Sequence, residues 1–399
     1  MAFSRLSLAG RTCLFDSLRL FFAGAVDSVF ISVSLLIAIR LFHASVGAKT
    51  LLSSMLWFGG LTAPALIRAA ASCRCSASRL CAALFAMTAL FLAGAAYATS
   101  VYQFILAIAL AGVCYRADGA AMARIYAENY GHGRMASRMA LGLVLSALMA
   151  IAFGQCSGAA MDRSIGNSRA IILISALCSL FGAAAAMAIP SGPIRSGEEV
   201  RSGSFLKYFV RNPLLAKMSI YFTAVGLAYQ MLIPMRIEHL TNRCHGWNLS
   251  NFRILLLSLV VPNAARLLST PLVAILFDRL RLIAVRILTN VIFLFGIAFY
   301  FDGQSFAALL VGGSLLGVAM AGSFVMHNLW LAKIVPPKDL PQCMAIYLLM
   351  TGLRSICAPF CSYALLSMGS TVTAAHGAAI LVIASTVGFW FLRREPAIR

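Results

Sequence analysis

The chain has 399 residues, of which 61% are hydrophobic and only 11% are charged. Because a soluble domain carries about 25% charged residues, this composition excludes an ordinary soluble protein. The formal net charge of +20 would suggest nucleic acid as a partner. However, the basic residues lie in short loops between apolar segments, which excludes that role and fits the positive-inside rule.

Apolar segments of about 20 residues recur along the whole chain, and this is the length that an α-helix needs to cross a bilayer. Only helices and closed barrels satisfy their backbone hydrogen bonds in lipid, and these segments are too long for barrel strands. We therefore expect an all-α polytopic membrane protein. The twelve predicted spans are Arg19–Phe42, Thr50–Ala70, Arg79–Thr99, Val101–Arg124, Met139–Ala160, Ala170–Ile189, Pro213–Met235, Asn251–Phe277, Ile283–Tyr300, Ser305–Leu331, Gln342–Met368 and Thr371–Leu392.

The distribution of basic residues predicts a multi-pass membrane protein with both termini in the cytoplasm. In this orientation Arg19 and Arg286 fall in inner loops, whereas Arg236 falls in an outer loop. The first apolar segment is longer than the hydrophobic region of a signal peptide and contains Asp27, so we expect it to be a retained span. The short loops and small size favour a bacterial chain in the inner membrane.

One polar stretch interrupts the apolar segments near the midpoint of the chain. Residues Ser191 to Arg211 are rich in Gly, Ser and charged side chains, which is typical of a linker. The chain then divides into an N-terminal bundle over 1–190, a cytoplasmic linker over 191–211 and a C-terminal bundle over 212–399. Two halves of six spans each predict an internal repeat about an axis along the membrane normal.

This arrangement resembles the major facilitator superfamily, and local motifs agree with the resemblance. Asp278, Arg279 and Arg281, between spans eight and nine, are similar to the family's cytoplasmic gate loop signature. Phe22–Asp27 resembles a first-span signature of the family, and Arg116 lies where many members carry an arginine in the fourth span. The resemblance implies two six-helix bundles with pseudo-twofold symmetry, which enclose a cavity lined by spans one, four, seven and ten.

Three charged residues stand inside the predicted spans of the N-terminal half. Asp27 and Asp118 each lie about 10 Å from the inner surface, and Arg116 lies about 13 Å from it, at 1.5 Å per residue. Asp27 and Arg116 can therefore pair, either as a static contact or as an ion pair that changes partner with protons or substrate. Arg116 and Asp118 are two residues apart and cannot share one helix face. Charges at this depth indicate a functional site.

The C-terminal half differs because we expect no acidic residue buried in its spans. Arg266 and Arg354 lie near mid-depth of spans eight and eleven, and Asn263 precedes Arg266 by one turn. Either arginine could bind a carboxylate or phosphate, or it could bond backbone carbonyls or extend toward an interface. The excess of arginine over aspartate favours an anionic substrate.

Other candidates are polar side chains without a charge partner. Tyr229 and Gln230 in span seven could line a cavity, and His327 in span ten could carry protons or be a satisfied polar residue. Gly154 and Gly158 have the spacing of close helix packing. No cysteine or histidine set has the spacing of a metal site, so we expect no metal and no cofactor.

These features predict a secondary active transporter of a small solute, with protons as a possible coupling ion and an organic anion or amphiphile as the favoured substrate. The expected partners are the solute and the lipid bilayer, and the expected state is a monomer. The alternatives are a flippase of lipid or lysolipid and a membrane scaffold without transport activity. An enzyme is not expected, because the sequence contains no catalytic motif and no phosphate-binding loop.

Overall fold

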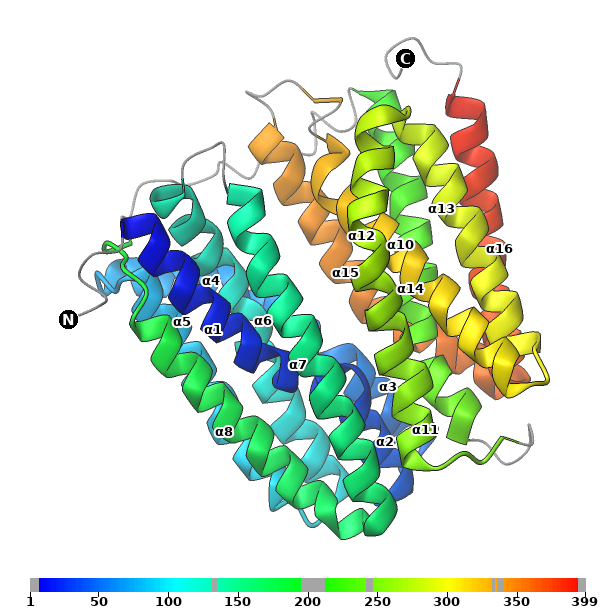
Figure 1. Cartoon of the computed structure of the whole chain (residues 1–399), viewed down its shortest axis with the longest axis horizontal. Helices are drawn as coiled ribbons and strands as arrows, with labels where there is room; N and C mark the ends of the chain where they lie inside the picture. Colours follow the sequence, from blue (N-terminus) through cyan, green and yellow to red (C-terminus); the bar gives the residue numbers. More distant parts are fainter. Residues whose placement is uncertain are drawn as a thin grey trace. The chain divides into compact units, whose positions relative to one another are not determined.

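The computed structural model describes residues 7–130, 135–194, 212–241, 247–331, 334–335 and 340–393. Their regular structure is helical, and the β-type pairing found among them is a single bridge between Ser76 and Pro193. Among these residues, eleven helices are long and apolar enough to cross a membrane, and one bent pair raises the number to twelve. The predicted all-α polytopic membrane fold is therefore confirmed (Figure 1).

The chain folds into two compact units. Unit 1 is Met1–Glu199 with Ser250–Leu259, and unit 2 is Val200–Leu249 with Val260–Arg399. The helices of unit 1 are α1 (Leu8–Ser28), η2 (Val29–Val33), α2 (Ser34–Arg40), α3 (Val46–Met55), α4 (Gly59–Ser72), α5 (Ala77–Ala96), α6 (Val101–Asn129), α7 (Met135–Arg163), η3 (Ile165–Asn167), α8 (Ser168–Met187) and α11 (Asn251–Leu255). The helices of unit 2 are α10 (Pro213–Thr241), α12 (Val261–Arg279), α13 (Leu282–Ile297), η7 (Ala298–Asp302), α14 (Phe306–Leu329), α15 (Leu340–Met368) and α16 (Thr371–Leu392).

A π-helical segment, η6 (Leu256–Val260), connects α11 to α12 along the chain. The boundary between the two units at Leu259 falls inside this segment. Residues 195–211 of the predicted linker lie outside the described part of the chain.

Serine side chains begin several of these helices. A serine hydroxyl at the N-cap accepts a hydrogen bond from an otherwise unpaired backbone N–H, which stabilises the first turn. At α16 the hydroxyls of Ser370 and Thr373 form a reciprocal capping box. The other serine N-caps with this bond are Ser7, Ser45, Ser76, Ser100, Ser250 and Ser305.

The first span begins at Leu8, so the predicted start at Arg19 was wrong by about three helical turns. Thr12, Asp16 and Arg19 lie inside α1 and are buried. Polar residues lower the hydropathy of this stretch, and therefore it resembles a loop in the sequence. The predicted ends of two other spans were also too early, because α6 continues to Asn129 and α10 continues to Thr241.

The second span is not a straight helix. Residues Val46–Ala63 and Ala65–Ser72 form a pair bent by 43°. The bend lies at position 64, which is a proline, and proline removes an N–H from the helical hydrogen-bond ladder. Close to the bend, Gly59 lies against the backbone of α6, because a Cβ at this position would overlap the carbonyl of Val113.

Helix α1 lies against α7 and α8 in unit 1, and its contact with α7 depends on a small residue (Figure 1). A Cβ on Gly24 would overlap the backbone carbonyl of Ser146 in α7. One turn further along, the Ser28 hydroxyl lies 3.0 Å from the Ala150 carbonyl of α7 and donates a hydrogen bond to it. The two helix backbones therefore approach closely at the depth of these residues.

The glycine pair of α7 also has a packing role. A Cβ on Gly154 would meet the side chain of Leu259, and one on Gly158 would meet the backbone of Phe252 in α11. Asp162, one turn beyond, accepts hydrogen bonds from the backbone N–H groups of Asn251 at 2.7 Å and Phe252 at 3.0 Å. The carboxylate of Asp162 thus caps the start of α11, and the glycines provide the close approach that the spacing predicted.

We predict that Gly24→Ala lowers the stability of the protein by about 1–3 kcal/mol, because the new methyl group must push apart two backbones. Thermal unfolding of the purified protein in detergent measures the effect. Gly94→Ala in α5 is the matched control, since nothing lies within 4 Å of a Cβ there. An unfolding midpoint for Gly24→Ala equal to that of the control would contradict the packing described for α1 and α7.

Candidate functional site

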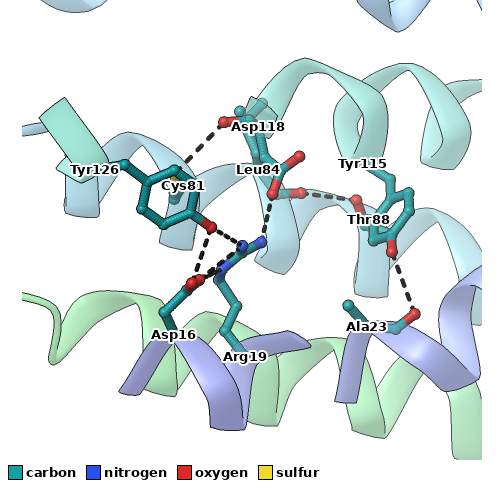
Figure 2. A network of polar contacts seen from close by, with 9 residues as sticks. All are labelled: Asp16, Arg19, Ala23, Cys81, Leu84, Thr88, Tyr115, Asp118 and Tyr126. Atoms are coloured by element: carbon teal, nitrogen blue, oxygen red, sulfur yellow. Dashed lines mark hydrogen bonds and ion pairs between the residues drawn. The ribbon is translucent and has the colours of Figure 1, made fainter. Parts of the chain in front are cut away.

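The guanidinium of Arg19 lies at the centre of a buried polar network in unit 1 (Figure 2). Its Nε and Nη2 donate to Oδ1 of Asp16, one turn earlier in α1, at 3.0 and 2.8 Å. Its Nη1 donates to Oδ2 of Asp118 in α6 at 2.6 Å. The side chains of Arg19 and Asp16 are only 4% and 3% exposed, so this is a sealed, charge-assisted contact.

Tyrosine and asparagine side chains extend the contact between α1 and α6. The Tyr126 hydroxyl donates to Oδ2 of Asp16 at 2.8 Å, so each oxygen of this carboxylate has a partner. Asn129 donates to the hydroxyl of Thr12 at 2.9 Å. The Tyr115 hydroxyl donates to the carbonyl of Ala23 at 3.2 Å (Figure 2). These bonds align the two helices along several turns and set their register.

The sequence reasoning missed this network because it placed Arg19 in an inner loop and gave no role to Asp16. A signal was present in the spacing. Thr12, Asp16 and Arg19 recur at intervals of four and three residues, which places them on one helix face. The partner of Arg19 was not visible, since Asp118 is 99 residues away in the chain.

Asp27 and Arg116 form a second contact between the same helices. Arg116 Nη2 lies 3.4 Å from Asp27 Oδ1, and the two side chains are 29% and 27% exposed. Asp27 Oδ1 and Arg116 Nε have no hydrogen-bond partner among the described protein groups. The Arg116 guanidinium also lies over the Trp57 ring, 4.9 Å from its centre. This pair is looser and more accessible than the Arg19 network.

Arg116 and Asp118 both contact α1, but at points about 12 Å apart along its axis. Asp118 meets Arg19, whereas Arg116 meets Asp27. The expectation that the two side chains point in different directions is compatible with this geometry. Helix α1 begins at Leu8, and Asp27 lies about 28 Å along it from that end.

Asp27 also lies next to an irregular stretch of backbone. The π-helical segment η2 begins at Val29, two residues after Asp27. Segments of this kind are rare and are found at functional sites, because they displace side chains from the regular helix pattern.

Unit 2 contains a buried carboxylate that the sequence reasoning excluded. Glu238 is 7% exposed, and the Tyr363 hydroxyl of α15 donates to its Oε1 at 3.0 Å. His239, also buried, contacts the Thr371 hydroxyl through Nδ1 at 2.9 Å. The expectation failed because the predicted seventh span ended at Met235, and therefore residues inside α10 were assigned to a loop.

Arg354 in α15 bonds a backbone carbonyl. Its Nη1 donates to the carbonyl of Phe222 in α10 at 3.0 Å. The guanidinium rests against α10 at Gly226, where a Cβ would overlap it. The sequence left open whether Arg354 binds an anion or bonds a backbone carbonyl, and the structure contains a carbonyl contact. This carbonyl belongs to another helix, α10, and not to a break in α15.

Arg266 in α12 is half-buried, and its side chain has no hydrogen bond or ion pair within the described residues. Tyr229 in α10 interacts electrostatically with Arg266, and its ring lies 6.1 Å from that of Phe293. Gln230 follows Tyr229, and its buried Oε1 has no protein partner among the described residues. Asn263 is buried one turn before Arg266. Arg266 is therefore a cation available to a ligand.

Other predicted residues lie apart from these groups. Asp278 and Arg279 end α12 and Arg281 precedes α13, so all three form an exposed turn. His327 belongs to α14, but its side chain is outside the described part of the structure. In the described residues, no group of three or more His, Cys, Asp or Glu side chains could hold a metal ion.

We predict that Arg19→Gln lowers the stability of the protein by about 3–5 kcal/mol, because it leaves two carboxylates buried without their counter-charge. Glu128→Gln is the control. It removes the 2.6 Å contact with Arg124 at a site that is 36% exposed, and we expect a loss below about 1 kcal/mol. Thermal unfolding compares the two variants, and equal losses would show that the network does not stabilise unit 1.

Comparisons with known proteins agree with this fold. Residues 247–399 match the family described as the Major Facilitator Superfamily. A point mutant of the nucleoside transporter NupG has a similar structure, with a TM-score of 0.77, 16% identity and coverage of 97% of this chain and 100% of that chain.

A bacterial homologue of the human lysosomal transporter Spinster, in an inward-facing and occupied conformation, is also similar. It has a TM-score of 0.69 and 13% identity, with coverage of 96% of each chain. No curated protein matches the chain in sequence. The family match covers the C-terminal part of the chain, and the two solved structures share its fold over almost the whole length.

Proposed function

We propose that the protein is a secondary active transporter that moves a small organic anion by alternating access and is coupled to protons. One observation carries this proposal, namely an accessible ion-paired carboxylate in unit 1 together with an excess of arginine inside unit 2. In unit 1 Asp27 pairs with Arg116, and both side chains are more than a quarter exposed.

The helices of unit 2 hold an excess of arginine. Within the described residues, unit 2 has one buried carboxylate, that of Glu238, and two buried arginines, and two further arginines are half-buried. The four arginines are Arg236, Arg266, Arg286 and Arg354. An accessible carboxylate can take up a proton, and an excess of arginine inside a membrane bundle favours an anion.

The proton is assigned to Asp27 by comparison of the three carboxylates. Asp27 is paired one-to-one with Arg116, whereas Asp16 and Asp118 share the guanidinium of Arg19. Asp16 and Asp118 have short contacts with Arg19, and their side chains are 3% and 17% exposed. Asp27 has a longer contact and 27% exposure, so it is the carboxylate that solvent protons reach most easily.

Protonation of Asp27 has a direct consequence for Arg116. The pair at 3.4 Å loses its Coulomb attraction when the carboxyl group is neutral. Arg116 is then available to an anion, and its guanidinium still lies over the rings of Trp57 and Tyr115. Proton binding and anion binding at this pair therefore support each other, as symport requires.

Arg266 is the proposed contact for the anion in unit 2. A guanidinium binds a carboxylate or phosphate with two parallel hydrogen bonds, and the side chain of Arg266 makes no such contact with the described residues. Tyr229 and Gln230 add a hydroxyl group and an amide for a neutral part of the solute.

The two structural relatives suggest other solutes to test directly. NupG is a nucleoside transporter, and a nucleoside is neutral, so it would not use the excess of arginine. The Spinster homologue is a lysosomal transporter homologue, and a charged amphiphile could use the same arginine. A first screen should therefore compare organic anions, nucleosides and lysolipids by thermal shift, since a bound ligand stabilises the folded state.

We predict that Asp27→Asn abolishes accumulation of the solute against its gradient in proteoliposomes but retains exchange of labelled for unlabelled solute. The amide cannot carry a proton, yet it leaves the fold and the solute site in place. Uptake with and without an imposed pH gradient measures the effect, with Glu128→Gln as the control that keeps both activities. Accumulation at the wild-type level in Asp27→Asn would exclude Asp27 as the proton site.

We also predict that Arg266→Lys weakens binding of the anion by roughly 10–100-fold, because lysine cannot form the paired hydrogen bonds of a guanidinium. Isothermal titration or thermal shift with the solute found in the screen measures the change. Arg163→Lys, at an exposed position in the last turn of α7, is the control for the same substitution away from the proposed contact. An affinity for Arg266→Lys that equals that of the control would place the anion elsewhere.

A further inference from the structure

Arg286 in α13 was expected in an inner loop, but it is buried in unit 2, with 3% of its surface exposed. Its Nη1 lies 3.5 Å from the Ser323 hydroxyl, which is at the limit of a hydrogen bond. Its Nε has no protein partner, and no carboxylate among the described residues pairs with it. Arg286 is thus a sealed cation without a counter-charge.

A second arginine lies near it and contacts the backbone of the same phenylalanine. The Arg286 guanidinium is 4.9 Å from the centre of the Phe222 ring, and Arg354 donates to the Phe222 carbonyl at 3.0 Å. The two cations are close enough to interact electrostatically. Arg354 Nε also lacks a protein partner in the described residues. Two like charges at such a position repel each other, so their arrangement needs an explanation.

Trp330 completes the group. Its ring is stacked on Phe222 with the ring centres 4.7 Å apart, and it is fully buried. The indole Nε1–H has no hydrogen-bond acceptor among the described residues. Buried N–H groups are almost always paired in native proteins, and three unpaired donors around one phenylalanine are therefore unusual.

Aromatic contacts do not account for this group. A cation above an aromatic ring recovers only part of the cost of removing a charge from water, and the cost is larger in a membrane-embedded bundle. The repulsion between the two arginines adds to it. A ligand with negative oxygen atoms would satisfy both guanidinium groups and the indole N–H together.

We propose that Arg286, Arg354 and Trp330 form a binding site for a phosphate group at the end of unit 2 where α10 and α13 begin. Two guanidinium groups and an indole N–H match a doubly charged tetrahedral oxyanion in charge and in number of donors. Arg354 is half-buried, whereas Arg286 is sealed, so the phosphate group enters past Arg354. This site is separate from Arg266, and it does not depend on transport.

The test is a thermal-shift titration of the purified full chain at constant ionic strength, with inorganic phosphate replacing chloride. We expect a saturable rise of the unfolding midpoint, about 5 °C at saturation. A second arm replaces phosphatidylcholine by phosphatidic acid in mixed micelles without free phosphate. A rise in either arm supports the site and identifies a soluble or a lipid source, and no rise in both arms would overturn the proposal.

Arg286→Met separates a binding site from a structural contact. It removes an unpaired buried charge at nearly constant volume, so the midpoint without phosphate should rise and the phosphate-dependent rise should disappear. A lower midpoint without phosphate, or an unchanged response to phosphate, would overturn the assignment. Ser323→Ala is the control and should keep the response, because the charge remains. If Arg286→Met does not fold, Arg354→Gln must lose the response in its place.

Discussion

The contact of Arg19 with Asp16 and Asp118 is the interaction on which unit 1 depends. A guanidinium that is 4% exposed inside a membrane helix is tolerated only where carboxylates and hydrogen bonds replace water. Asp16 comes from the same helix and Asp118 from α6, so the contact joins α1 to α6 at one register. The contact between Asp27 and Arg116 joins the same two helices.

The Arg19 network and the Asp27–Arg116 pair of unit 1 differ in contact length and in exposure to solvent. The contacts of the Arg19 network are short, and the side chains of Arg19 and Asp16 are buried. The Asp27–Arg116 pair is longer, more than a quarter exposed and without complete hydrogen bonding. The Arg19 network sets the register of α1 and α6, and the looser Asp27–Arg116 pair lies a few turns away on the same two helices. This combination is a suitable basis for a proton-dependent step in the proposed transport.

Two charged side chains inside unit 2 have neutral hydrogen-bond partners. Glu238 receives a hydrogen bond from a tyrosine, and Arg354 donates to a backbone carbonyl across from Gly226. Its other arginines are not neutralised by carboxylates within the described residues, so unit 2 keeps an excess of positive charge inside its helices. The proposed anion contact at Arg266 and the proposed phosphate site at Arg286 both depend on this excess of positive charge, although the two arginines lie in different helices.

The sequence by itself determined the membrane fold and most of the spans, because the length of an apolar segment is a local property of the chain. It also indicated Asp27, Arg116, Arg266 and Arg354 as candidates, since a charge inside an apolar segment is visible without a structure. Only the tertiary structure decided which charged stretches are buried. Arg19, Glu238 and Arg286 resemble span ends in the sequence because each lowers the local hydropathy. Whether such a residue meets water or a partner depends on contacts from distant segments, such as Asp118 for Arg19 and Tyr363 for Glu238, and no local pattern encodes those contacts.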